Sequence, residues 1–142
     1  MKYFKKLKDT IVRFSKKGLS PKEIALAIAI GNFIGFFPII GTHTITAFVL
    51  SYILRLNTLI VILGTQISNP ISYPFQIFIS AELGSLILKG KFLEITFSSK
   101  INYIDHYILP IIVGSIILGS MVSTLSYILI KNFLYKTPSL PA

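Results

Sequence analysis

Two segments rich in glycine, proline and short polar side chains interrupt long apolar runs of this chain. The first reads GFFPIIGTHT over residues 35–44, and the second reads GTQISNPISYP over residues 64–74. In a bilayer, backbone freed from a helix is tolerated only where it is buried in protein or lines a wet cavity. Membrane transporters commonly hold their substrates at interrupted helices. We therefore expect function at these two breaks, which are set by Pro38, Gly41, Pro70 and Pro74.

Composition identifies the class of protein. Of the 142 residues, 53% are hydrophobic and only 13% are charged, and the mean hydropathy is +0.75. Residues 24–54, 56–81 and 107–130 contain no Asp, Glu, Lys or Arg. Each run exceeds the roughly 20 apolar residues that cross a hydrocarbon core. These features predict a multi-pass, all-α membrane protein.

The net charge of +9 is concentrated before the first apolar run. Basic residues beside a membrane segment favour a cytoplasmic amino terminus. No DNA-binding motif or aromatic platform accompanies them, so we expect no nucleic-acid partner. Apolar residues at helical spacing predict an interfacial amphipathic helix over residues 1–19. Its cations either bind anionic lipid headgroups or serve only to orient the chain; they are Lys5, Lys6, Lys8, Arg13, Lys16 and Lys17.

Five segments follow from this pattern. After the interfacial helix, residues 20–88 should form a membrane core of two broken-helix hairpins, which could be re-entrant. Residues 89–106 read as a polar loop, residues 107–132 as a long transmembrane helix, and residues 133–142 as a disordered tail. The first core helix should begin at the Ser20-Pro21-Lys22-Glu23 capping box and end before Pro38.

Small residues at four-residue spacing predict close helix packing. Such stripes let membrane helices approach one another, either within one chain or between protomers. A chain with few crossings could bury its broken backbone by forming a homo-oligomer. The stripe residues are Ala27, Gly31 and Gly35, then Ser80 and Gly84, and finally Ser115, Gly119 and Ser123.

The sequence offers little for catalysis. There is no cysteine, and the two histidines and five carboxylates form no hydrolytic, phosphate-binding or metal-ligand motif. We therefore expect no enzyme activity, no metal site and no cofactor.

The polar residues of the breaks have two interpretations each. His43 could carry a proton-linked function, or it could stay neutral and bond carbonyls freed at Pro38. The start of the helix after Asn69 could bind a lipid phosphate, or Asn69 could simply cap it with Pro70 at the first helical position. The candidate substrate-binding residues are Thr42, His43, Thr44, Gln66, Ser68, Asn69 and Ser72.

The motifs around these breaks support one resemblance. Ser20-Pro21-Lys22-Glu23, Phe37-Pro38-x-x-Gly41-Thr42-His43-Thr44, Arg55-Leu56-Asn57 and Ser68-Asn69-Pro70-x-Ser72-x-Pro74 stand in this order. Together they resemble the domain of unknown function 2062 family, over about residues 18–88. The resemblance implies a small bacterial integral membrane protein, and hence the cytoplasmic (inner) membrane. It brings no established activity, although some members are joined to glycosyltransferase-like domains.

Two functions from different classes remain open. The protein could bind or translocate an amphiphile, such as a polyprenyl phosphate, through its breaks. Alternatively, it could be an oligomeric scaffold that recruits cell-envelope glycan or lipid enzymes without transport. An ion channel is a weaker third option, because no ring-forming charge lies inside an apolar run.

Overall fold

The computed structural model of the chain describes residues 6, 9, 13, 18–39 and 41–136. These residues form helices and connecting loops, without strands. In chain order the helices are α2 (Pro21–Phe36), α3 (His43–Ile53), α4 (Thr58–Thr65), α5 (Tyr73–Lys89), the π-helical turn η1 (Ile104–Ile108) and α6 (Leu109–Lys136).

Helix α2 begins as the capping box predicts. Glu23 N–H donates to Ser20 Oγ over 3.2 Å, and Ser20 N–H donates to Glu23 Oε2 over 2.7 Å. These hydrogen bonds favour the ionised carboxylate, so they lower the pKa of Glu23. Helix α2 ends at Phe36, two residues before Pro38, because the residue preceding a proline is disfavoured in α geometry.

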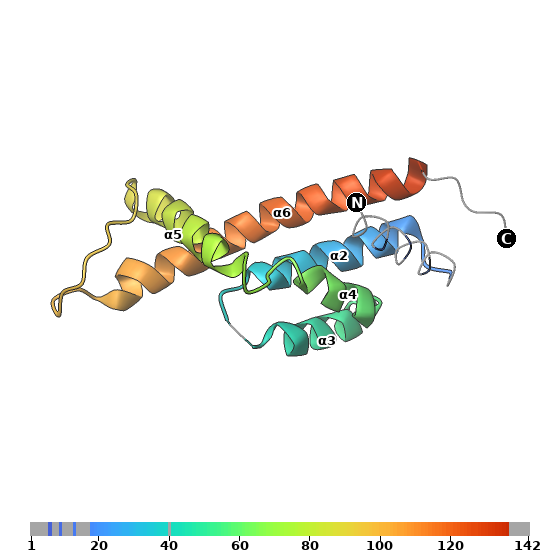
Figure 1. The fold of residues 1–142 in the computed structure, drawn as a ribbon, viewed down its shortest axis with the longest axis horizontal. Helices are drawn as coiled ribbons and strands as arrows, with labels where there is room; N and C mark the ends of the chain where they lie inside the picture. The colour runs from blue at the N-terminus through green and yellow to red at the C-terminus, as the bar shows by residue number, and fades with distance from the viewer. Residues whose placement is uncertain (1–5, 7–8, 10–12, 14–17, 40, 137–142) are drawn as a thin grey trace.

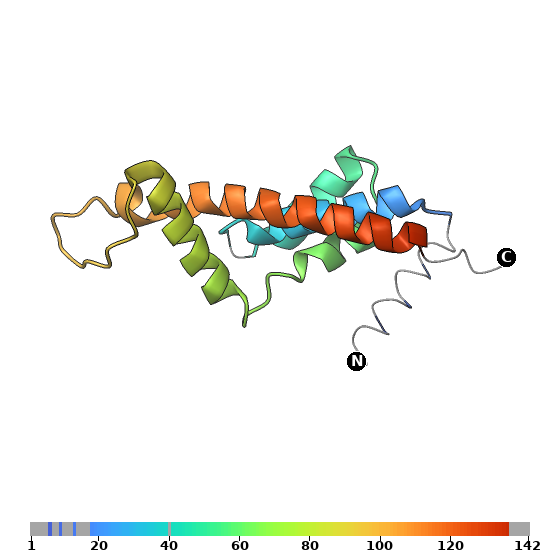
Figure 2. The same cartoon turned by 90° about the horizontal axis from the view of Figure 1, so that it is seen from above.

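The helices lie along one long axis (Figures 1 and 2). The start of α2, the turn between α3 and α4, and the end of α6 all lie at one end, which we call the near end. The long loop between α5 and η1 lies at the opposite, far end. Helix α6 runs the length of the molecule and packs against α2 in its near half and α5 in its far half.

Helix α6 continues from η1 without interruption. Together they form the one helix among the described residues that is long and apolar enough to cross a membrane, Ile104–Lys136. The helix that covers the expected transmembrane segment, residues 107–132, is therefore longer than predicted at both ends, and residues 133–136 are helical. The remainder of the predicted tail, residues 137–142, lies outside the described residues.

Glycines bring the backbones of neighbouring helices into contact. A Cβ atom added to Gly31 of α2 would lie 2.7 Å from the Gly64 Cα of α4, and one added to Gly64 would lie 2.9 Å from the Gly31 Cα. Helices α5 and α6 cross in the same way, with Gly84 against the carbonyl of Pro110 and Gly114 against the carbonyl of Ser80. Any side chain at these four glycines would collide with backbone.

The predicted small-residue stripes lie at these contacts within a single chain. Gly35 packs on Ile67, and Gly119 packs on Phe36. Buried polar or small side chains accompany them, namely Ala27, Ser80 and Ser115. Ser123 also buries its hydroxyl on α6. The sequence alone could not distinguish contacts within a chain from contacts between protomers.

The two breaks direct the chain differently, so only one of the two predicted hairpins is a reversal. After the first break, α3 runs back toward the near end beside α4. After the second break, α5 continues to the far end and packs on α6 (Figures 1 and 2). The expectation of two equivalent hairpins is wrong in this respect, because helix–breaker–helix sequences do not specify the angle at the break.

The turn between α3 and α4 contains a backbone outlier. Arg55 adopts a left-handed conformation, with φ of 55°, at the position after the α3 C-cap where glycine is usual. The N–H of Leu56 donates to Ser51 O over 2.8 Å, and the N–H of Arg55 donates to Tyr52 O over 3.3 Å. This pair of bonds is a Schellman motif. Asn57 then caps α4 by accepting from Ile60 N–H over 3.2 Å.

We predict that Arg55→Gly stabilises the folded protein in detergent by about 1 kcal/mol, because glycine carries no Cβ penalty in the left-handed region. Arg55→Ala is the matched control, since it removes the same charge and keeps the penalty. The measurement is the thermal melting temperature by circular dichroism. Equal melting temperatures for the two variants would show that backbone strain at Arg55 is negligible.

Candidate functional site at the two helix breaks

The first break is closed by its own side chains. Gly41 takes a left-handed conformation with φ of 86°, and Thr42 Oγ1 donates to Ile39 O over 3.0 Å. His43 Nε2 lies 2.9 Å from the carbonyl oxygen of Phe37, which can only accept, so Nε2 carries the proton. His43 thus makes the backbone contact that the second of its two interpretations requires.

The second break is closed by an amide and a hydroxyl. Asn69 Oδ1 accepts from the N–H groups of Ile71 and Ser72, both over 2.9 Å. Asn69 O also accepts from Tyr73 N–H over 2.9 Å. Asn69 therefore closes the turn before α5, but the expectation of Asn69 as the helix N-cap with Pro70 at the first helical position is wrong, because the N-cap of α5 is Ser72. Helix α5 proper begins three residues after Pro70, at Tyr73, with Pro74 in its first turn.

Ser72 and Gln76 return to the carbonyl that the break frees. Ser72 Oγ donates to Ile67 O over 2.7 Å, and Gln76 Nε2 donates to the same oxygen over 3.0 Å. Gln76 Oε1 in turn accepts from Ser68 Oγ over 2.8 Å. Ser68, Ser72 and Gln76 therefore form one hydrogen-bonded group with the broken backbone.

The two breaks lie beside one another. A Cβ atom on Gly35, just before the first break, would lie 3.1 Å from Ile67 Cγ2, 3.1 Å from Thr65 O and 3.4 Å from Ser68 Cβ. The end of α2 thus contacts the beginning of the second break. Residues separated by more than 25 positions in sequence meet in one region, near the middle of the long axis (Figure 1).

Two of the seven predicted site residues remain available to a ligand. The side chains of Thr44 and Gln66 are exposed, and neither hydrogen-bonds to another described residue. The other five are engaged in closing the breaks. If this region binds a ligand in the state described here, the side chains of Gln66 and Thr44 can reach it without breaking existing bonds. The same holds for Nδ2 of exposed Asn69, since only its Oδ1 atom is bonded.

Sequence reasoning missed three polar residues, Gln76, Asn32 and Ser126, that stabilise this region or the helices beside it. Gln76 completes the second break, and its signal was an amide inside an apolar helix. Asn32, which is 6% exposed, donates through Nδ2 to Ser126 Oγ over 2.7 Å and so joins α2 to α6. An isolated polar residue in an apolar run could have identified Asn32, because such residues often bond across membrane helices.

The other predicted groups lie elsewhere. Among the cations expected at lipid headgroups, Lys6 and Arg13 are exposed, and Lys5, Lys8, Lys16 and Lys17 lie outside the described residues. His106 is at the far end, where Nε2 contacts Glu94 O over 2.8 Å. Within the described ranges, no three His, Cys, Asp or Glu side chains gather in a way that could hold a metal ion.

The family of the chain follows from its sequence as a whole. Residues 4–138 match the family described as an uncharacterized protein conserved in bacteria, DUF2062. The chain belongs to this family. The match includes both breaks and α6, so it extends well beyond the 18–88 region whose motifs carry the resemblance. No curated protein and no solved structure matches the chain.

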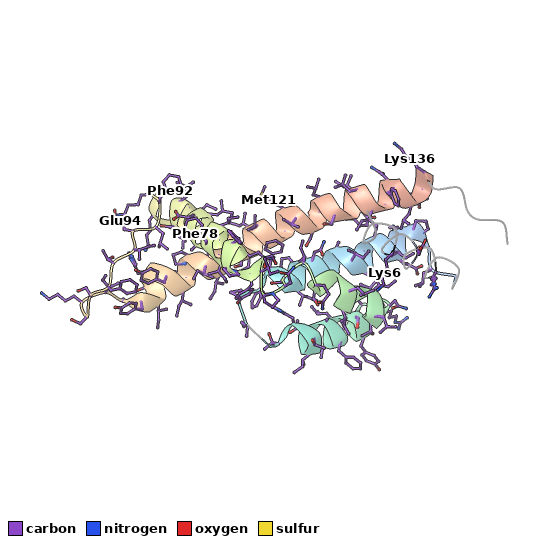
Figure 3. All side chains as sticks on the ribbon, viewed as in Figure 1. Lys6, Phe78, Phe92, Glu94, Met121 and Lys136 are labelled. Atoms are coloured by element: carbon purple, nitrogen blue, oxygen red, sulfur yellow. The ribbon has the colours of Figure 1, made fainter. Side chains whose placement is uncertain are left out.

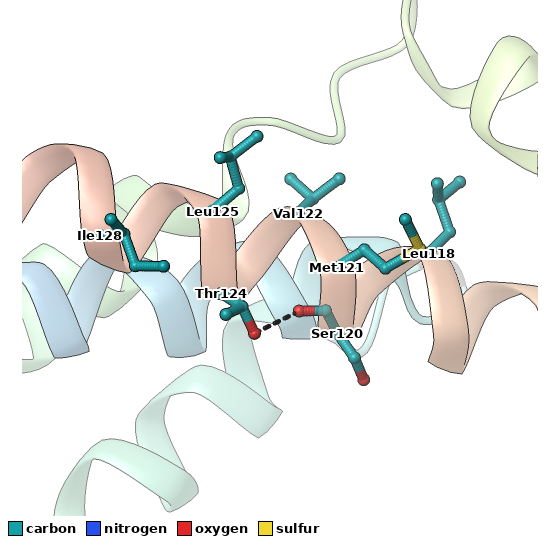
Figure 4. Close-up of a pocket in the computed structure, with 7 residues that line it drawn as sticks. All are labelled: Leu118, Ser120, Met121, Val122, Thr124, Leu125 and Ile128. Atoms are coloured by element: carbon teal, nitrogen blue, oxygen red, sulfur yellow. Dashed lines mark hydrogen bonds between the residues drawn. The ribbon is translucent and has the colours of Figure 1, made fainter.

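This DUF2062 chain also carries an apolar groove on the outer face of α6 (Figure 4). It is a shallow, largely open depression of about 620 Å³ that is lined by α6 alone. The hydroxyls beside it are turned back onto the helix: Ser120 Oγ donates to Ile116 O over 2.6 Å, and Thr124 Oγ1 donates to Ser120 O over 2.8 Å. The groove therefore presents hydrocarbon; its lining residues are Leu118, Ser120, Met121, Val122, Thr124, Leu125 and Ile128.

We predict that Asn69→Ala destabilises the second break by about 0.5–2 kcal/mol, the usual loss when a capping acceptor is removed. Asn69→Asp is the matched control, because it keeps the oxygen that accepts from Ile71 and Ser72. Hydrogen exchange of these two amides in detergent measures the effect. Unchanged protection in Asn69→Ala would contradict a capping role for Asn69.

Proposed function

We propose that this protein is a multi-pass protein of the bacterial inner membrane, with its near end in the cytoplasm. The helix ends and the turn at the near end carry Lys22, Arg55, Lys131 and Lys136, together with the carboxylate Glu23. At the far end, three lysines are balanced by three carboxylates, namely Lys89, Lys91 and Lys100 with Glu82, Glu94 and Asp105. This asymmetry fits the positive-inside rule.

The helix lengths support a position of the breaks inside this membrane. At 1.5 Å per residue, the 16 residues of α2 extend about 24 Å from the near end. The 11 residues of α3 and 8 residues of α4 are shorter still. None of the three crosses a hydrocarbon core of about 30 Å. In this topology α4 with α5 makes one crossing and α6 makes a second, while α2 and α3 form a re-entrant pair.

Within this topology we propose that the breaks bind or translocate an amphiphile with a phosphate-bearing headgroup, such as a polyprenyl phosphate. The observation that carries the proposal is the contact between the two breaks at Gly35, Ile67 and Ser68. Paired interruptions near mid-depth are where transporters hold polar groups. The exposed Gln66 and Thr44 supply neutral donors there, and the cations of the near end attract anionic headgroups. The proposal assigns no catalytic step to the protein.

The test is transbilayer movement of a labelled polyprenyl phosphate in proteoliposomes, with a labelled phosphatidylcholine in parallel. We expect wild type to move the polyprenyl phosphate and Gln66→Ala to lose most of this activity while its melting temperature is unchanged. Thr124→Ala is the matched control, because its hydroxyl lies on the outer face of α6, away from the breaks.

Two results would contradict this function. One is movement no faster than in empty liposomes, from wild-type protein shown to be folded and inserted. The other is full activity in each of the three single variants Gln66→Ala, His43→Ala and Asn69→Ala. That result would leave the polar residues of the breaks without a role in transport.

The groove on α6 favours a second candidate, an oligomeric or enzyme-recruiting scaffold. It runs along exposed apolar side chains, including Met121 and Leu125, where a helix of a partner could pack. The small-residue stripes, by contrast, are already occupied by contacts within the chain. Gly31→Leu or Gly119→Leu would therefore damage the protomer itself and could not report on assembly.

We predict that, if the scaffold function holds, Leu125→Asn lowers the apparent mass of the detergent-solubilised protein, because it places an amide in an otherwise apolar groove. Exposed Phe75 on α5 is the matched position, so Phe75→Asn should leave the mass unchanged. Light scattering coupled to size-exclusion chromatography makes the measurement. A monomeric wild type would remove the oligomeric form of this candidate.

A further inference from the structure

The far-end loop contains an extended segment that is bound along its whole length. This strap, residues 91–97, lies against α5 on one side and η1 on the other. Ser85 Oγ donates to Lys91 O over 2.9 Å, and Glu82 Oε2 accepts from Leu93 N–H over 3.1 Å. These two contacts fix the first half of the strap to helix α5.

The second half of the strap is fixed to η1. The ring of His106 contacts Glu94 O through Nε2 over 2.8 Å. The Tyr107 hydroxyl accepts from Thr96 N–H over 2.9 Å and donates to Thr96 O over 2.7 Å. Lys91 Nζ and Glu94 Oε1 form an ion pair of 3.1 Å within the strap. The inner edge of the strap is thus occupied by polar bonds.

Three large apolar side chains of the strap are exposed, next to the exposed Lys91–Glu94 ion pair. Phe92 is 68% exposed, Ile95 is 69% exposed and Phe97 is 86% exposed. Phe92 lies at the far end of the molecule, and Lys136 lies at the other end (Figure 3). The hydrogen bonds of the strap hold these large apolar side chains in an exposed position. In water that exposure would be unfavourable, so we expect another surface to cover them.

The position of the strap along α6 indicates what covers these side chains. If Lys131 marks the cytoplasmic edge of the hydrocarbon, about 20 residues of helix reach the opposite edge, near Ile111. Tyr107 and His106 then lie about 6–8 Å beyond that edge, in the headgroup layer. The strap bonds to both residues, so it lies at the same depth.

The surroundings of the strap match the chemistry of that layer. Tyr103 and Tyr107 stack with ring centroids 5.9 Å apart, and tyrosines are enriched at membrane interfaces. Lys89 and Lys100 add cations, which favour phosphate groups. Exposed Phe78 on α5 and Ile108 on η1 continue the apolar surface toward the membrane interior.

We propose that the strap is a membrane-interface wedge, whose Phe92, Ile95 and Phe97 side chains insert among the headgroups and upper acyl chains of the outer leaflet. The inference rests on the membrane placement proposed above and goes beyond it by assigning a lipid-binding surface to the far-end loop. Glu82, Ser85, His106 and Tyr107 act as positioning residues that hold the wedge at its depth.

The chain contains no tryptophan, so single tryptophans report depth without background. We expect Phe97→Trp and Phe92→Trp, each reconstituted in phosphatidylcholine vesicles, to emit at shorter wavelength than free tryptophan. Lipids brominated near the headgroup should quench both strongly, lipids brominated near the acyl end should quench them less, and aqueous acrylamide should quench them weakly. Met121→Trp, from a side chain 63% exposed on α6, is the control and should be quenched most by the deep label.

Three results would overturn the wedge. Strong quenching by acrylamide with none by brominated lipids would place the strap in water. Protection from both quenchers would mean that a protein surface covers it. If Met121→Trp is quenched by acrylamide and not by the deep label, the membrane placement itself is wrong; if Met121→Trp is quenched by the deep label and the strap positions are not quenched by either lipid label, only the wedge is wrong.

Discussion

The hydrogen bond between a polar side chain and a carbonyl freed from a helix is the interaction on which this fold depends. A backbone group that is removed from water without a partner is costly, and the second break frees such a group at Ile67. Ser72 with Gln76 takes the carbonyl of Ile67, and His43 adds a second bond to the carbonyl of Phe37, which also accepts from Ile39 N–H. Because each break is satisfied locally, the half-length helices between them can fold back into the protein, and glycines can then bring α2 and α4 to backbone contact.

Closure of the breaks by their own side chains also bears on the proposed function. Oδ1 of Asn69 and Nε2 of His43 are bonded to backbone, so these atoms can contact a ligand only by exchanging partners. A transport path through this region would therefore meet Gln66, Thr44 and Nδ2 of Asn69 first. The two proposed functions consequently use different parts of the molecule: the breaks in one case and the outer face of α6 in the other.

Local features of the fold could be predicted from sequence, and long-range ones could not. The Ser20–Glu23 capping box and the end of α2 before Pro38 depend on neighbouring residues, and both are in the structure. Asn69 accepts from nearby N–H groups as expected, but it does so in a turn, and α5 begins only after Ser72. The stripe at Gly31 indicated close packing, but its partner Gly64 belongs to no stripe. Only the path of the chain between them brings the two glycines together.

The same distinction holds for the candidate site. Which residues stand at the breaks was evident from Pro38 and Pro70, whereas the contact between the breaks depends on the reversal at α3. The angle at each break also depends on tertiary packing: α3 returns beside α4, but α5 is held by its crossing with α6 at Gly84 and Gly114. Sequence periodicity contains no information on that choice.

The π-helical turn η1 has a geometric consequence for the two ends of the long helix. Proline has no N–H, so Pro110 cannot bond the carbonyl of His106, which instead accepts from Lys89 Nζ over 3.4 Å. The N–H of Leu109 bonds Ile104 O, five residues back. This wider turn rotates the preceding residues about the helix axis. Their side chains therefore point in a different direction than they would if α6 continued as a regular α-helix. The far end of the helix can therefore aim His106 and Tyr107 at the loop while Gly114 stays in register with α5.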